Sequence, residues 1–146
     1  MRRVIGIVAA FTLAGPPIGA AAMQFIVAAR SVAAGDYHDL ANVVAAFPYV
    51  IAFSYLLAGP AAFATGTACA IALRFVPGRV KFFVAAAFGF AFSFLWMAFR
   101  TDGWGQNGAW PASGAWPFAI VGAIAAVGSL AVFEYFRSVQ ANRPAS

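Results

Sequence analysis

Charged residues are scarce in this sequence. Nine of its 146 residues are Lys or Arg and four are Asp or Glu, so only 9% carry a charge, whereas 64% are hydrophobic. A soluble domain is typically about 25% charged and about 45–50% apolar. A short chain also leaves much of its surface exposed, because small domains bury a smaller fraction of it. The shortage of charge therefore excludes an ordinary water-soluble domain and indicates a surface that faces lipid.

The residues that build most metal and redox sites are also rare. Cys69 is the single cysteine and His38 the single histidine. One cysteine excludes a disulfide within the chain and supplies no zinc motif. Asp36 and Asp39 flank His38 and offer a partial set of metal ligands, but loop acids more often cap a helix. We therefore expect no metal and no cofactor.

Catalytic patterns are missing as well. No Asp or Glu lies in the middle of an apolar run, and no buried hydroxyl has a base near it in the sequence. The motifs of a nucleophile elbow, a phosphate loop or a zinc-binding helix do not occur. Because an enzyme needs a nucleophile, a base or a metal within mutual reach, the sequence predicts that the protein is not an enzyme. The scattered basic residues also argue against nucleic acid as a partner.

Four long apolar runs dominate what the sequence does contain. They cover approximately residues 4–29, 48–73, 82–99 and 115–136. A spanning helix needs about 20 mostly apolar residues, whereas barrel strands would alternate over about 10. The sequence therefore predicts an all-α integral membrane protein with four transmembrane helices in an antiparallel bundle. Residues 1–137 would form this single domain, and residues 138–146 would form a polar cytoplasmic tail.

Basic residues are distributed unequally about these runs. Two of them, Arg30 and Arg100, would lie on one side of the membrane. The other side would hold the remaining seven, which are Arg2, Arg3, Arg74, Arg79, Lys81, Arg137 and Arg143. Since basic residues at the ends of spans favour the cytoplasm, we expect both termini there. The alanine-rich composition is typical of a GC-rich bacterial genome, so the expected location is a bacterial inner membrane.

The start of the chain also has a second interpretation. Arg2 and Arg3, an apolar stretch, the breakers at 15–17 and three alanines at 20–22 together form the pattern of a signal peptide. The apolar run continues to Ala29, which is longer than a typical signal and favours a retained span. Cleavage would leave three spans and an external N-terminus.

The segment before the second run is moderately amphipathic. Asp36 or Asp39 could cap a short helix over Leu40–Phe47, which would lie at the membrane interface. A residue that precedes proline is disfavoured in a helix, so this helix is expected to end before Pro48.

Prolines and small residues inside the runs are the candidate functional positions. Proline kinks a helix and frees carbonyls that can line an ion path, whereas small residues four apart let helices approach closely. They serve either packing within the bundle or contact with a partner. The candidates for helix packing or hinges are Gly15, Pro16, Pro17, Gly19, Gly59, Pro60, Gly66, Ala85, Gly89, Ser93 and Gly122.

Three tryptophans surround the last connection between runs. Trp104, Trp110 and Trp116 lie where the third run ends and the fourth begins. Tryptophan at the ends of spans is typical of an interfacial aromatic belt. An aromatic platform for a sugar or for a partner's loop is the alternative.

One short segment occurs twice. Leu13-Ala14-Gly15-Pro16 recurs 44 residues later as Leu57-Ala58-Gly59-Pro60. In consecutive spans this relates two antiparallel helices, as in inverted transporter repeats. Chance similarity within alanine-rich sequence is the alternative.

Together these features favour a small multi-pass membrane protein that is a non-catalytic accessory or structural component of a membrane assembly. Its partners would be the lipid bilayer and either another membrane protein or further copies of the same chain. The alternative is a small oligomeric channel or transporter, which the prolines and the repeated segment favour.

Overall fold

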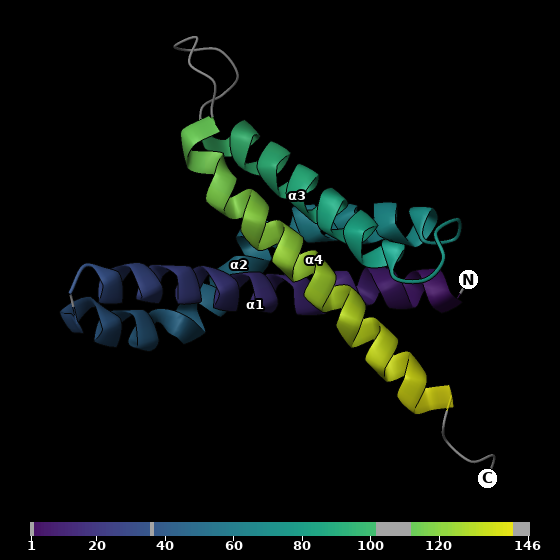
Figure 1. The fold of residues 1–146 in the computed structure, drawn as a ribbon, viewed down its shortest axis with the longest axis horizontal. Helices are drawn as coiled ribbons and strands as arrows, with labels where there is room; N and C mark the ends of the chain where they lie inside the picture. Colours follow the sequence, from purple (N-terminus) through teal and green to yellow (C-terminus); the bar gives the residue numbers. More distant parts are fainter. Residues whose placement is uncertain (1, 36, 102–111, 142–146) are drawn as a thin grey trace.

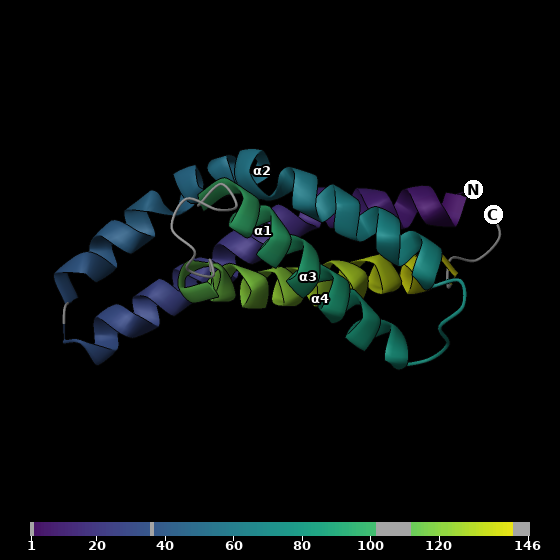
Figure 2. The same cartoon turned by 90° about the horizontal axis from the view of Figure 1, so that it is seen from above.

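Four helices make up the fold. The computed structural model describes residues 2–35, 37–101 and 112–141, and all regular structure in these ranges is helical. The helices are α1 (Arg2–Ala33), α2 (Tyr37–Ala72), α3 (Val80–Thr101) and α4 (Ala112–Ala141). Consecutive helices run in opposite directions, and the start of α1 and the end of α4 lie at the same end of the molecule (Figure 1 and Figure 2). The predicted all-helical fold is confirmed.

Each helix is long and apolar enough to cross a membrane. The four candidate spans are Arg3–Ala33, Leu40–Ala72, Val80–Ala98 and Trp116–Ala141. The shortest has 19 residues, which at 1.5 Å per residue gives about 28 Å, close to the ~30 Å of a hydrocarbon core. The prediction of a multi-pass membrane protein therefore agrees with the helix lengths.

The predicted break before Pro48 is wrong. Helix α2 is continuous from Tyr37 to Ala72 and contains both Pro48 and Pro60. A proline inside a helix removes one backbone donor, and membrane helices tolerate this loss because other groups can satisfy the freed carbonyl. Residues 40–47 are therefore the first part of α2 rather than a separate interfacial helix. A bend in α2 is visible in Figure 2.

Glycines with a positive φ follow α1 and α2, and the last helix ends later than the sequence predicted. Gly35 follows α1 with a φ of 75°, and Gly78 lies between α2 and α3 with a φ of 64°. Glycine adopts this left-handed backbone without steric cost, so both positions suit tight reversals of the chain. Helix α4 continues to Ala141, so residues 138–141 of the predicted tail are helical. Residues 142–146 lie outside the described part of the chain.

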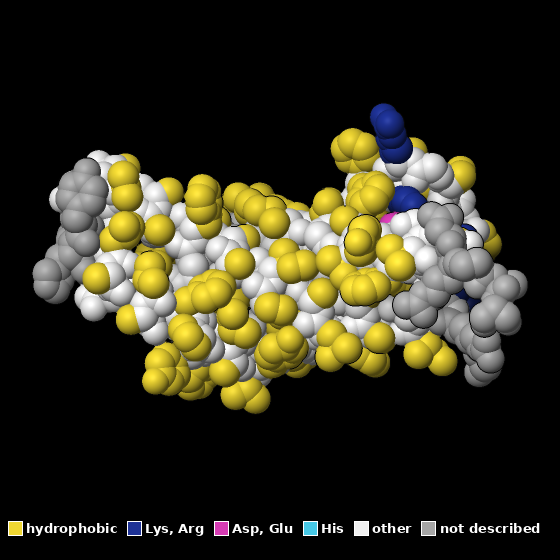
Figure 3. All heavy atoms as spheres, turned by 90° about the horizontal axis from the view of Figure 1, so that it is seen from below, with side chains coloured by type: hydrophobic (Ala, Val, Ile, Leu, Met, Phe, Trp, Pro, Cys, Tyr) yellow, Lys and Arg dark blue, Asp and Glu magenta, His cyan; other side chains and the backbone are white. Residues whose placement is uncertain are grey.

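The core lies in the half of the molecule that contains the start of α1 and the end of α4, here named the terminal half. Eight buried residues from all four helices pack together there: Ile7, Phe11, Cys69, Ala70, Leu73, Ala85, Ala126 and Leu130. Lys81 Nζ lies 2.8 Å from a carboxylate oxygen of Glu134, so an ion pair joins α3 to α4. Charged side chains gather at this end, and the rest of the face in Figure 3 is mostly hydrophobic.

Candidate functional site

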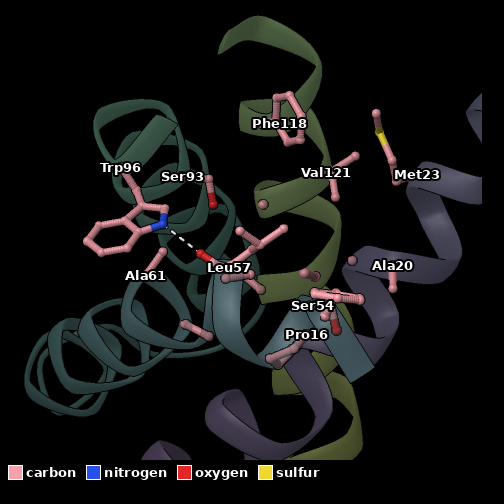
Figure 4. Close-up of a pocket in the computed structure, with 18 of the residues that line it drawn as sticks. Pro16, Ala20, Met23, Ser54, Leu57, Ala61, Ser93, Trp96, Phe118 and Val121 are labelled. Carbon is pink, nitrogen blue, oxygen red and sulfur yellow. Dashed lines mark hydrogen bonds between the residues drawn. The ribbon is translucent and has the colours of Figure 1, made fainter. Parts of the chain in front are cut away.

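A cavity of about 730 Å³ lies between the four helices on the other side of this core. The half of the molecule that contains it is named the distal half. Figure 4 shows its wall, to which α1 contributes Met23, α2 Leu57, α3 Trp96 and α4 Phe118. Pockets that bind small molecules typically measure about 300–1,000 Å³. The cavity is therefore large enough for a ligand.

Small residues leave this space open. The lining includes Gly15 and Ala20 of α1, Ala58 and Ala61 of α2, and Gly122 of α4. None of these side chains reaches far beyond its own backbone, so little side-chain volume fills the space between the helices. Small residues thus have two effects in this protein: they allow close contact at helix crossings and leave a void between them.

The cavity is also bordered by the least covered helix. None of the most apolar 18-residue window of the span Leu40–Ala72 is buried. Three lining residues of α2 are half exposed or more, with exposed fractions of 70% for Tyr49, 59% for Phe53 and 50% for Leu57. Because α2 is a candidate membrane span, this side of the cavity would be reached from lipid rather than from water.

The chemistry of the wall is almost entirely apolar. Among the described residues that line the cavity, none carries a carboxylate, an imidazole, an amine or a guanidinium. The hydroxyls of Ser54, Thr65 and Ser129 donate hydrogen bonds of 2.6–2.7 Å to carbonyl oxygens of their own helices. General acid–base catalysis needs a titratable group near the reacting atoms. The wall can hold an apolar molecule, and the phenol of Tyr49 is its one titratable side chain among the described residues.

Metal ligation finds no support in the described part of the chain. No group of three or more His, Cys, Asp or Glu residues comes close enough there to hold an ion. Asp36 and the side chains of His38 and Asp39, the candidates from the sequence, lie outside what the structure describes.

A side chain of α2 bonds to the proline turn of α1. Pro17 has no N–H, so the carbonyl of Leu13 lacks its usual donor four residues on. The hydroxyl of Tyr55 donates a hydrogen bond to this carbonyl, with 2.7 Å between the oxygens. The carbonyl that Pro17 frees is therefore occupied, and it is less available to an ion than the sequence suggested.

The second copy of the repeated segment shows a related contact. The carbonyl of Leu57, which corresponds to Leu13, lies in the helical turn that precedes Pro60. The indole Nε1 of Trp96 donates a hydrogen bond of 2.6 Å to it, across the interface between α2 and α3 (Figure 4). In both copies the leucine carbonyl thus accepts a bond from an aromatic side chain of the next helix.

Three of the predicted packing positions meet where α3 and α4 cross. A Cβ atom added to Gly89 would overlap the backbone of Gly122, and one added to Gly122 would overlap Ser93. Only residues this small allow the two backbones to approach so closely. Ala85, one turn before Gly89, is fully buried in the core.

The predicted glycines of α1 and α2 occupy different environments. A Cβ at Gly66 would lie 2.8 Å from Cβ of Phe11, in the tight contact of α1 with α2. A Cβ at Gly15 would make ordinary contacts with Ser129 and Ala62 at 3.4 and 3.5 Å. Gly59 has nothing within 4 Å of such an atom, so it makes no close helix contact within the described chain.

The remaining candidates are more dispersed. Pro16 is buried and lines the cavity, Pro17 is half-buried, and Pro60 is exposed. A Cβ at Gly19 would make ordinary contact with Val121 of α4 at 3.4 Å.

Of the belt tryptophans, only Trp116 belongs to the described part of the chain. It is half exposed, and its ring centroid lies 5.5 Å from that of Phe90 and 5.6 Å from that of Phe94. It therefore packs α4 against α3. Trp104 and Trp110 lie outside the described residues.

Four residues with clear structural roles were missed from the sequence. Tyr55 and Trp96 make the bonds to the two leucine carbonyls, and an aromatic ring with a polar group inside a candidate span signals that a partner is needed. Gly6 lies against Phe133, with 2.9 Å between an added Cβ and the ring, and Gly128 lies against Ile18 at 3.1 Å. Gly6 begins a series of small residues four apart with Ala10 and Ala14, which is typical of a packing face, whereas Gly128 has no small residue four positions away.

Comparison of the chain with protein-family models, with curated proteins and with solved structures finds no match.

Proposed function

We propose that this chain is a non-catalytic membrane protein that holds an apolar molecule taken from the bilayer, and that it serves as an accessory component of a membrane assembly. The single observation behind the proposal is the apolar cavity of about 730 Å³ between the four helices. Among the described residues, its wall offers apolar contact surface but no carboxylate, imidazole, amine or guanidinium. Binding is therefore the activity that the geometry supports best.

The size of the cavity favours a small molecule or a lipid chain over a helix of a partner. A helix with its side chains is about 10–12 Å across, so less than about two turns would fit into this volume. A flexible apolar chain can follow an irregular space and enter beside α2. The cavity would hold the bound molecule, and contact with a membrane protein partner or a second copy would use the outer helix faces.

The proposed topology has four retained spans and both termini in the cytoplasm, in the inner membrane of a bacterium. Its support is the excess of basic residues at the end where α1 begins and α4 ends. Retention of α1 is further supported because Ile7 and Phe11 belong to the buried core. The intact mass of the purified protein should therefore include residues 1–22, and loss of that segment would refute the four-span topology.

Photocrosslinking in a bilayer tests the proposed binding. A fatty acid with a diazirine on its chain is incorporated into vesicles that contain the full-length protein, and the labelled residues are mapped by mass spectrometry. We expect label on cavity residues that are nearly buried, such as Ala20 and Val121. Label confined to exposed residues such as Leu56 and Phe63 would contradict binding within the cavity.

A matched pair of variants in α2 provides the control. Ala58 lines the cavity and is half-buried, whereas Ala52 is exposed and does not line it. Ala58→Phe should lower labelling of the cavity residues several-fold because it fills the space. Ala52→Phe adds the same ring outside and should leave the labelling unchanged. Equal labelling in both variants would refute the proposal.

An oligomeric channel or transporter is the competing proposal. The occupied carbonyl of Leu13, one of those that proline frees, weighs against it. Liposomes that contain the protein should show no flux of potassium or chloride above protein-free liposomes. Measurable flux that Ala58→Phe abolishes would favour the channel instead.

A further inference from the structure

A second and smaller cavity lies at the charged end of the molecule, between the first turns of α1 and the end of α2. Its volume is about 240 Å³. Two arginines and four apolar residues line it: Arg3, Val4, Ile7, Ala70, Leu73 and Arg74. Ile7, Ala70 and Leu73 are buried, so the cavity has a closed apolar floor beneath two basic side chains.

The two arginines carry charge that nothing in the described part of the chain neutralises. Both are exposed, and neither forms an ion pair with a described residue. The acid at this end, Glu134, is bonded to Lys81 at 2.8 Å and lies 3.9 Å from Arg137. The cavity thus keeps an uncompensated double positive charge, contributed by two different helices.

The depth of the cavity matches the level of lipid headgroups. Arg3 is the first residue of the span Arg3–Ala33, and Arg74 follows the end of the span Leu40–Ala72 by two residues. Both arginines therefore lie at the ends of candidate spans, and Ile7 lies one helical turn farther into its span. A ligand at this position would have an anionic part at the arginines and an apolar part along the helices.

We propose that this cavity binds the phosphate group of an anionic phospholipid. Guanidinium groups bind phosphate oxygens through paired hydrogen bonds, and two guanidiniums can share one phosphate. The positive end of the α1 dipole adds to the attraction. The lipid chain would run along the apolar surface beside Val4. This site is separate from the larger cavity and does not depend on the function proposed for it.

Native mass spectrometry of the full-length protein in detergent tests the site. The protein is titrated with phosphatidylglycerol, with phosphatidylcholine and, in a third series, with inorganic phosphate. We expect phosphatidylglycerol to bind at least about tenfold more tightly than phosphatidylcholine, and inorganic phosphate to bind weakly. Replacement of both arginines, in Arg3→Gln with Arg74→Gln, should lower the affinity for phosphatidylglycerol by about tenfold or more.

Two further variants keep the test decisive. Arg30→Gln with Arg79→Gln removes the same charge outside the cavity and should leave the affinity nearly unchanged. Arg3→Lys with Arg74→Lys keeps the charge but loses the planar fork of donors, so an intermediate affinity is expected. Equal losses in the two glutamine pairs would indicate diffuse attraction and would overturn the proposal. Inorganic phosphate that binds as tightly as the lipid would also overturn it, because the ligand would then be a soluble anion.

Discussion

The terminal half and the distal half of this molecule are built from the same four helices but are packed in different ways. In the terminal half, buried side chains such as Phe11 and Leu130 fill the space between the helices. In the distal half the helices border a partly open cavity of about 730 Å³. Since lipid is as apolar as these side chains, hydrophobicity alone does not drive helices together in a membrane. The difference between the halves therefore comes from the fit of side chains rather than from their polarity.

The polar interactions differ between the halves as well. The terminal half is joined by the ion pair of Lys81 with Glu134, whose side chains are each about a quarter exposed. The distal half is joined by two bonds from aromatic side chains to backbone carbonyls, those of Tyr55 and Trp96. Such bonds hold neighbouring helices together without requiring close packing, so they suit the half that keeps a cavity.

The largest expected effect on stability comes from placing an oversized side chain in the terminal half. Gly66→Leu places a side chain against Phe11 and the backbone of Val8, and it should lower the free energy of unfolding by about 3 kcal/mol. Gly59→Leu, two turns earlier in α2, meets nothing within 4 Å and should leave stability unchanged or slightly higher. Unfolding by dodecyl sulfate in mixed micelles measures both. Similar losses in the two variants would mean that the two halves are packed alike.

Truncation of a leucine in each half comes next. Leu130 is fully buried and Leu57 is 50% exposed beside the cavity. We expect Leu130→Ala to cost about 2–4 kcal/mol, because it leaves a void in a packed core, and Leu57→Ala to cost less than about 1 kcal/mol. The same unfolding titration provides the comparison. A larger loss for Leu57→Ala would show that the distal half is the better packed one.

A smaller effect tests the bond at the proline turn of α1. Tyr55→Phe removes the hydroxyl that binds the Leu13 carbonyl and should cost about 0.6 kcal/mol, the average for such bonds within membranes. In a Pro17→Ala background the helix regains its own donor for that carbonyl, so the same change should cost almost nothing. The difference between the two backgrounds in a double-mutant cycle measures the coupling. Equal costs would contradict this role of Tyr55.

The smallest effect concerns the ion pair of the terminal half. Lys81→Met removes the contact of 2.8 Å with Glu134 and should cost about 0.5–1 kcal/mol. Arg137→Met removes only a contact of 3.9 Å from a mostly exposed side chain and should cost less than about 0.3 kcal/mol. The cost of Lys81→Met should also fall as salt is added, since salt screens the pair. A cost that does not depend on salt would point to packing instead.

The class of fold could be predicted from the sequence because lipid imposes a simple requirement. About 20 consecutive apolar residues are needed to cross it, and four such runs are visible without knowledge of any contact. The same reasoning failed at Pro48, because proline predicts a helix end in water, whereas in a membrane span it often lies inside the helix.

The contacts between helices could not be predicted in the same way. Gly59 and Gly66 are the same residue type on one helix, yet only Gly66 lies at a crossing, because Phe11 faces it from α1. The cavity was missed for the same reason, since it depends on which faces of four helices meet. At the same spacing of 44 residues as the repeated segment, Phe11 corresponds to Tyr55. The exposed fraction of Phe11 is 1% and that of Tyr55 is 42%, so the surroundings of the two copies differ.

The bonds at the proline turns have a consequence for how the protein is made. Helix α1, a candidate membrane span, has a carbonyl at Leu13 that the helix itself cannot satisfy, and the donor for it, Tyr55, belongs to α2. The turn of α2 before Pro60 is in turn bonded by Trp96 of α3. Because the interior of a bilayer supplies no other donors, α1 is completed by the helix synthesised after it, whereas the Leu57 carbonyl of α2 keeps its own helical donor at Ala61. A ribosome that stalled after the first span would therefore leave α1 in lipid with an unsatisfied backbone carbonyl at Leu13.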